Sequence, residues 1–368
     1  MSGAASESVT FTIDALPAAH GDCLWIEYGD QRAPNRILID CGTQGSSAAL
    51  LKRIDGLPRH DRVFELFVLS HIDADHIGGA LPVFGAIKRD LRFSDVWFNG
   101  WRHVSGQLSA RQAEMFSTAI VDLELPWNLW RDGGAIVTDD ADLPERILPG
   151  GMRLTLLSPT PASLSNLGPV WKRELKRQGL EPGGRVDYSR FLKGTPSTIA
   201  DAAALKDIDK LADAKFTGDR GAPNGSSIAL LAEFGGASIL LTGDAHAPVL
   251  VDSIRTLLRR RDARRLKLDL FKISHHGSQN NLSRELLDLV DCSRYLISTN
   301  GDHFYHPDRQ AIARILKYGG ERKGLFFNYC NRFNEVWGSK ALASVRETYT
   351  CTAFYAPANR PGIRIALL

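Results

Sequence analysis

Four apolar segments of strand length are each followed closely by aspartate or histidine. The four are ILID with Asp40, FVLS with the run from His71 to His76, ILLTGD with Asp244, and LFKIS with His275 and His276. A strand that is buried on both faces reads as a continuous apolar run, and α/β folds bind ligands at the carboxyl ends of such strands. We therefore expect these ends to converge on one site. The alternative is a set of unrelated, solvated loop residues.

The rest of the chain alternates predicted strands with predicted helices, which favours a layered α/β or α/β/β/α architecture over an all-β one. Residues 1–8 read as a frayed tail, and 9–368 as one domain with an insertion at about 160–220. Strands are expected within 9–45 and at 63–70, 95–101, 152–159, 226–235, 237–244, 268–276 and 294–300. Helices are expected at 78–90, 197–214, 248–262 and 283–290.

Composition excludes several classes of protein. No stretch approaches the ~20 apolar residues that cross a bilayer, and the start lacks a signal peptide, so a cytoplasmic location is the default. The five cysteines are scattered and form no CxxC pair, which argues against a disulfide framework or a thiolate zinc site. The net charge of +3 is too small to indicate a nucleic-acid binder by itself.

The stretch HIDADHIGG at 71–79 carries four potential metal ligands. Alternate residues of an extended loop point the same way, so His71 and Asp73 could bind one ion. Asp75 and His76 could bind a second ion close by. Imidazole and carboxylate donors without thiolate suit Zn²⁺, Fe or Mn²⁺, and the carboxylate share leans toward the harder ions.

HIDADHIGG resembles the HxHxDH signature of the metallo-β-lactamase superfamily, with Asp73 where histidine is commonest. Together with LLTGD at 240–244, LFKISHHGS at 270–278 and NGDHFYHP at 300–307, it is similar to the C-terminal hydrolase domain of the competence protein ComEC and its stand-alone relatives. The four blocks occur in order over most of the chain. The resemblance implies an αββα sandwich, with two mixed β-sheets flanked by helices and a dinuclear metal site at the sheet edge.

The resemblance also implies a role for each matching residue. His71 and Asp73 would bind the first ion and Asp75 and His76 the second, with Asp244 bridging the two. One histidine of HHGS would complete the second site; the pattern favours His276, and His275 stays open as ligand or catalytic residue. Residues that would support the ligands from behind are Asp40 and Asp22.

The sequence departs from the common pattern at one place. Most relatives carry a metal-binding histidine before the bridging aspartate, whereas this chain reads APNGSS, with Asn224 nearest that position. ComEC-like members share this loss. An oxygen-rich first site favours Mn²⁺, with Zn²⁺ second and Mg²⁺ as a further option. Asn224 and Asp75 join His275 as candidate catalytic residues.

Two divalent ions lower the pKa of a bound water and suit phosphodiesters, because both attacking and leaving oxygens need charge stabilisation. Basic runs at 171–179 and 254–267 could follow a phosphate backbone, although solvated helix faces are the usual explanation. We therefore expect a nuclease or phosphodiesterase acting on DNA or RNA. Candidate substrate contacts are His306, His103 and Lys272; for His103, a structural hydrogen bond is the alternative.

Two other functions fit the same motifs. One is a hydrolase of a small ester, thioester, lactam or cyclic nucleotide. The other is a non-catalytic module of a larger complex, for example a defence complex, with partner proteins encoded in the same operon. The sequence does not indicate an oligomeric state.

Overall fold

Two mixed β-sheets form the centre of the molecule in the computed structural model, which describes residues 8–85, 90–104, 111–139, 142–177, 205, 207–357 and 362–368. The six-stranded sheet has the order β18(Ile363–Ala366), β1(Val9–Ala15), β2(Leu24–Asp30), β3(Asn35–Ile39), β5(Leu66–Val68) and β7(Val96–Trp97). The eight-stranded sheet has the order β17(Cys351–Tyr355), β16(Lys323–Phe327), β15(Arg294–Ile297), β13(Leu270–Lys272), β11(Ala237–Leu241), β10(Ala229–Phe234), β9(Arg153–Ser158) and β8(Glu145–Ile147). Two short pairs, β4(Val63–Phe64) with β6(Arg92–Phe93) and β12(Leu266–Leu268) with β14(Val290–Cys292), accompany them.

Both sheets combine antiparallel and parallel pairing. In the first, β18, β1, β2 and β3 pair antiparallel, while β3, β5 and β7 run parallel. In the second, β8 to β11 pair antiparallel, while β11, β13, β15, β16 and β17 run parallel. The parallel strands place their carboxyl ends at a common edge of each sheet.

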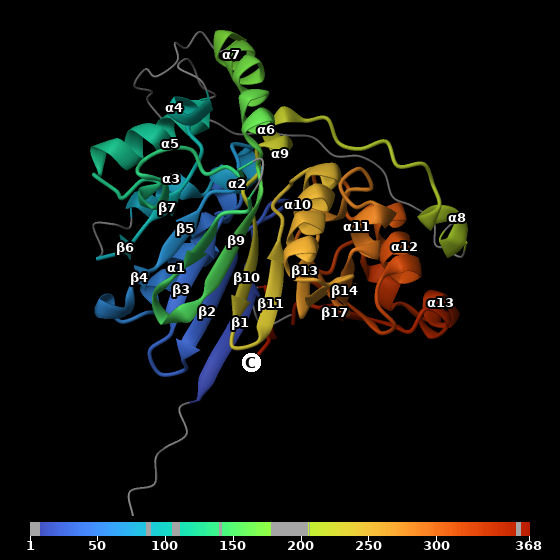
Figure 1. Ribbon diagram of the computed structural model, residues 1–368. Coiled ribbons are helices and arrows are strands. Elements are labelled where there is room, and N and C mark those ends of the chain that lie inside the picture. Colours follow the sequence, from blue (N-terminus) through green and yellow to red (C-terminus); the bar gives the residue numbers. More distant parts are fainter. Residues whose placement is uncertain are drawn as a thin grey trace, which may run out of the picture.

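Helices cover the outer face of each sheet (Figure 1). On the first sheet these are chiefly α1(Ser47–Asp55), α3(Ala80–Gly85), α4(Trp101–Val104) and α5(Arg111–Asp122), while α7(Leu167–Arg177) contacts α4 and projects above the sheets in this view. On the second they are chiefly α8(Ile208–Ala212), α10(Ala247–Arg260), α11(Arg284–Asp288), α12(Arg309–Tyr318) and α13(Ala343–Thr348). Three short helices, α2(Ala74–Ile77), α6(Pro161–Ser165) and α9(Ala222–Gly225), lie toward the upper end of the sheets in this view.

Because side chains alternate in direction along the strands, the apolar core has three layers: one between the two sheets and one between each sheet and its helices. In β3, Ile37 and Ile39 point into the cluster between the two sheets, whereas Leu38 packs against the helices of the first sheet. In β11, Ile239 faces the other sheet and Leu240 faces the helices. Such two-sided burial explains why these strands read as continuous apolar runs. The predicted αββα sandwich is confirmed.

The predicted elements agree with the described structure apart from their bounds. The expected helix 248–262 is α10, and the expected strand 237–244 is the shorter β11. The C-terminal strands β16, β17 and β18 were not predicted; β18 returns to pair with β1. Residues 1–7, most of the predicted insertion (178–204 and 206) and the first part of the expected helix 197–214 lie outside the described residues.

Candidate metal centre

The four strand ends converge as expected. Asp40 follows β3, the His71–His76 run follows β5, Asp244 follows β11, and the paired histidines follow β13. Gly21 and Gly79 allow the close backbone contacts that this requires: an added Cβ would lie 1.6 Å from the Asp75 carbonyl oxygen at Gly21, and 2.1 Å from the Cys41 carbonyl oxygen at Gly79. No other residue fits at either position.

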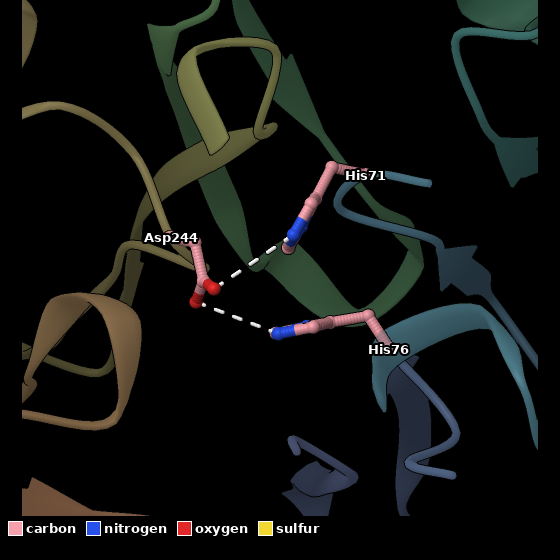
Figure 2. A group of neighbouring side chains, drawn as sticks. All are labelled: His71, His76 and Asp244. Atoms are coloured by element: carbon pink, nitrogen blue, oxygen red, sulfur yellow. Dashed lines mark ion pairs between the residues drawn. The ribbon is translucent and has the colours of Figure 1, made fainter. Parts of the chain in front are cut away.

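Asp244 lies at the centre of four imidazoles. Its Oδ2 is 3.7 Å from His71 Nε2 and 3.8 Å from His275 Nε2. Its Oδ1 is 3.5 Å from His76 Nε2 and 3.7 Å from His276 Nε2. Figure 2 shows His71 and His76 reaching from one side toward different oxygens of the carboxylate. The two oxygens therefore face two separate pairs of imidazole nitrogens.

The opposite ring nitrogen of each histidine is held by a hydrogen bond. His76 Nδ1 donates to Asp40 Oδ2 at 2.7 Å, and His276 Nδ1 donates to the Ser298 carbonyl oxygen at 2.7 Å. His71 Nδ1 lies 3.0 Å from Ser70 Oγ, whose own hydrogen goes to Asp40. In each case Nδ1 is turned toward a neighbouring oxygen, so Nε2 is the ring nitrogen directed at the centre.

His275 is held in the same way by residues that the sequence analysis did not identify. Its Nδ1 lies 3.0 Å from Asn281 Oδ1 and 3.4 Å from Asp219 Oδ2. Asn281 also donates to Asp219 and to the Asp244 carbonyl oxygen. Burial would raise the pKa of the Asp219 carboxyl, but hydrogen bonds from His275 and Asn224 outweigh it and hold that pKa below its usual value. No motif in the sequence pointed to Asp219 or Asn281.

Two further carboxylates, Asp75 and Asp73, each lie close to one of these imidazoles. Asp75 Oδ2 is 3.5 Å from His276 Nε2, and Asp73 Oδ2 is 3.6 Å from His71 Nε2. Asp73 occupies the N-cap position of α2, but its side chain makes no capping hydrogen bond there. Burial alone would raise the pKa of the Asp75 carboxyl, but hydrogen bonding with His276 and the charge of His76 outweigh burial and hold that pKa well below its usual value.

These residues fit divalent ions. His71, His76 and Asp244 form one compact group, and Asp75, His76 and His276 form another, each with donor atoms within 4.8 Å of one another. Two donors at about 2.1 Å from one tetrahedral ion lie about 3.4 Å apart. The Asp244 oxygens lie 3.5 to 3.8 Å from the four imidazole Nε2 atoms, which is close to that separation. Among the described residues, the buried atoms His71 Nε2 and Asp244 Oδ1 have no hydrogen-bond partner. Such atoms are costly unless another group, such as a cation, satisfies them.

A third group, Asp22 and Asp40 with His76, lies behind the first two. Asp40 adopts a left-handed backbone conformation with φ 57° and accepts hydrogen bonds from the Ser70 amide, the Ser70 hydroxyl and His76. Asp22 Oδ1 lies 3.5 Å from His276 Nδ1 and its other oxygen pairs with Lys272. Burial would raise the pKa of Asp22, and the Lys272 charge reverses that shift, so the carboxyl stays ionised.

The predicted substrate contacts lie in three different environments. Lys272 is fully buried and paired with Asp22, so its ammonium group cannot reach a substrate, and the sequence-based expectation for it is not supported. His103 Nε2 lies 3.1 Å from the Gly133 carbonyl oxygen, and its ring packs edge-on against Trp127 at 5.0 Å. Burial, together with the charge of Arg102, lowers the pKa of His103 to about 4. Those contacts match the structural alternative. His306 lies beside the centre, with its ring 5.4 Å from that of His275.

Asn224, which stands nearest the place where the resemblance implies a histidine, is buried. Its Nδ2 donates to Asp219 Oδ2 at 2.7 Å and lies 3.2 Å from His275 Nδ1. The amide thus contacts the residues that hold His275, and the imidazole of His275 occupies the space facing Asp244.

The basic run at 254–267 is largely paired. Arg261 makes two hydrogen bonds to Glu233 at 2.8 and 2.7 Å, Arg255 pairs with Glu285 at 2.6 Å, and Arg260 pairs with Asp142. Arg265 donates to the backbone carbonyls of Leu287 and Val290. A surface that follows phosphates needs cations free to exchange their partners. The pairing therefore favours the solvated helix face over a phosphate contact along this run.

No protein-family model matches the sequence. ComE operon protein 3 of Bacillus subtilis (strain 168) is 26% identical over 117 residues, which cover 32% of this chain and 14% of that protein. This chain therefore spans only a small part of that relative's length. None of the helices in the described residues is long and apolar enough to cross a membrane.

Three solved structures are similar at low identity. The metallo-β-lactamase fold protein YhfI from Bacillus subtilis is 10% identical, with 98% of this chain and 100% of that chain covered and a TM-score of 0.43. CmlA, a diiron β-hydroxylase from Streptomyces venezuelae, is 12% identical, with 98% and 54% covered and a TM-score of 0.38. The MIM-2 metallo-β-lactamase is 19% identical, with 41% and 53% covered and a TM-score of 0.21. The chain is thus an αββα sandwich whose four motifs meet at one edge, as its resemblance to the metallo-β-lactamase superfamily implies, and along about a third of its length it is similar to ComE operon protein 3.

Proposed function

We propose that this chain is a metal-dependent hydrolase that cleaves phosphodiester bonds in DNA or RNA. One observation carries the proposal: the two oxygens of buried Asp244 face two separate pairs of imidazole Nε2 atoms. A carboxylate placed in this way can bridge two ions. Paired ions suit phosphodiesters because they stabilise charge on both the attacking and the leaving oxygen.

The proposed ligands divide into two sets that share Asp244. The first set is His71, Asp73, His275 and Asp244 Oδ2; the second is Asp75, His76, His276 and Asp244 Oδ1. Bound there, divalent ions would lower the pKa of a water and polarise the bond to be cleaved.

In this assignment both histidines of HHGS are ligands, one for each ion. In this assignment His275 provides the first site with a nitrogen donor in place of the histidine that the resemblance implies near Asn224. The first site is then less oxygen-rich than its sequence suggests, which removes the reason for preferring Mn²⁺ to Zn²⁺. We propose either ion as the cofactor.

The chain's own residues would handle protons and orientation. Asp75 is buried beside His276, and its carboxylate would orient the attacking water or accept its proton. Asn224 and Asp219 would fix His275. We propose His306 as a substrate contact because its ring lies next to that of His275. Cytoplasmic location and operon-encoded partner proteins stay predictions.

The experiment is a cleavage assay with purified protein in Mn²⁺, Zn²⁺ or Mg²⁺, using single-stranded DNA, plasmid, RNA and a small carboxylic ester as substrates. Wild type should cleave a nucleic acid. Asp244→Asn should lose activity and bound metal, measured by elemental analysis. Asp252→Asn makes the same change at an exposed position of α10 and should alter neither.

Turnover of the ester without cleavage of any nucleic acid would overturn the phosphodiesterase assignment in favour of a small-ester hydrolase. Unchanged metal content in Asp244→Asn would overturn the ligand assignment.

A further inference from the structure

Three aromatic rings form an exposed ledge beside the metal centre: His20, His303 and Phe304, called here the aromatic ledge. The His20 and His303 rings are stacked, with centroids 4.8 Å apart and planes at 26°. Phe304 packs edge-on against His303 at 4.4 Å and against His20 at 5.6 Å. Phe304 nevertheless keeps 42% of its surface exposed to solvent.

The aromatic ledge borders the centre directly. The Phe304 ring lies 6.3 Å from that of His275 and 6.1 Å from that of His306. On the other side, the loop of His20 runs against Asp75, where Gly21 leaves no space for a side chain. A group resting on the ledge would therefore adjoin both proposed ligand sets.

Hydrogen bonds join the two loops that carry the ledge to each other and to neighbouring segments. The Asn300 amide donates to the Ala19 carbonyl oxygen at 2.8 Å, and the Ala19 amide donates to the Tyr329 hydroxyl oxygen at 3.0 Å. Ser298 Oγ donates to the Gly21 carbonyl oxygen at 3.0 Å. The rings are thus held in place before any ligand binds, which reduces the entropy lost on binding.

A comparison with Phe354 shows what distinguishes Phe304. Phe354 is 43% exposed, but it stacks on Phe326 of the neighbouring strand at 4.6 Å, an ordinary cross-strand pair. Phe304 lies on a loop and contributes to none of the three buried hydrophobic clusters in the described residues. Its exposed ring is surrounded by imidazoles of a polar site.

We propose that the aromatic ledge stacks an unpaired nucleobase next to the bond that is cleaved, so that the substrate is single-stranded nucleic acid. The inference rests on the proposed phosphodiesterase function and narrows its substrate. Aromatic side chains bind every base through its π-face, whereas a base within a duplex is already stacked on both sides. A single strand that binds through such stacking does not require phosphate contacts with the basic residues along α10.

Binding tests the ledge separately from catalysis. Fluorescence anisotropy would compare a labelled single-stranded oligonucleotide with an abasic oligonucleotide of the same length and charge. Wild type should bind the base-containing strand about 5- to 150-fold more tightly, the weight of one base–aromatic stack. Phe304→Ala should lose most of that difference, Phe304→Trp should keep it, and Phe354→Ala should leave it unchanged.

Equal affinity of wild type for the two strands would overturn the proposal that the ledge stacks a base. An equal loss of affinity for both strands in Phe304→Ala would overturn it as well. His303→Ala provides a second variant should Phe304→Ala fail to fold, judged by its thermal unfolding. Cleavage of the same two strands is the readout for the proposed function. Base-dependent binding without any cleavage would overturn the phosphodiesterase and leave a base-binding site; cleavage with base-independent binding would overturn the ledge alone.

Discussion

Two regions of this molecule concentrate ionisable side chains, and they differ in how those side chains are satisfied. At the metal centre, four histidines and the carboxylates around them are mostly buried, and His71 Nε2 and Asp244 Oδ1 are among the buried atoms that lack hydrogen-bond partners in the described residues. Along the second half of α10, arginines are partly exposed and paired with carboxylates. Buried imidazoles and carboxylates that converge from several strand ends therefore mark a site more reliably than the density of charge does.

The largest expected effect comes from splitting the two ligand sets. His71→Gln and His276→Gln should each reduce bound metal from two ions to one per chain, measured by elemental analysis. Each should lower the rate about 10³-fold, because an ion contributes several kcal/mol and about 1.36 kcal/mol corresponds to a factor of ten. His60→Gln changes an exposed histidine and should have neither effect. If His275→Gln keeps both ions, the division of HHGS between the sites is wrong.

Metal addition should stabilise the fold measurably. An ion that binds only the folded chain, at 100 times its Kd, adds about 2.7 kcal/mol to the free energy of unfolding. Denaturant titration with and without Mn²⁺ or Zn²⁺ measures this change. The increase should disappear in Asp244→Asn. An equal increase in that variant would mean that the stabilising ion binds elsewhere.

Removing support behind a ligand should have a smaller effect. Asp40→Asn keeps the shape of the side chain but replaces the carboxylate oxygen that accepts the His76 hydrogen. Loss of such a support weakens metal affinity about 10- to 100-fold. Competition with a metal-binding dye would measure the affinity, with Asp252→Asn as the matched control. Unchanged affinity would show that Ser70 alone is enough to orient the ligands.

The smallest effect is expected in the paired basic region. Arg261→Ala removes an exposed ion pair with Glu233 and should cost about 0.2–1 kcal/mol of unfolding free energy. Cleavage of nucleic acid and its dependence on salt should not change. Arg264→Ala, at an exposed position of the same run, provides the comparison. A salt dependence reduced by about one counterion in Arg261→Ala would show that the run binds phosphate after all.

Much of the architecture could be predicted because strand periodicity and strand ends are local properties. Ile37, Leu38 and Ile39 indicate a strand buried on both faces, and the aspartate that follows indicates its end. Asp219 and Asn281 could not be predicted. Their importance comes from contacts with His275 across loops that no periodic pattern describes.

The sequence by itself determined the layered α/β architecture, the edge where the strands end, and the residue types that meet there. The tertiary structure decided which atoms meet. His275 and His276 both adopt left-handed backbone conformations, with φ of 48° and 55°, and this turn directs adjacent side chains at different oxygens of Asp244. The tertiary structure also buried Lys272 against Asp22 and paired Arg255 and Arg260 of α10 with carboxylates. Side-chain direction in such a turn, and the partners of charges distant in the chain, depend on packing between elements, which local sequence does not encode.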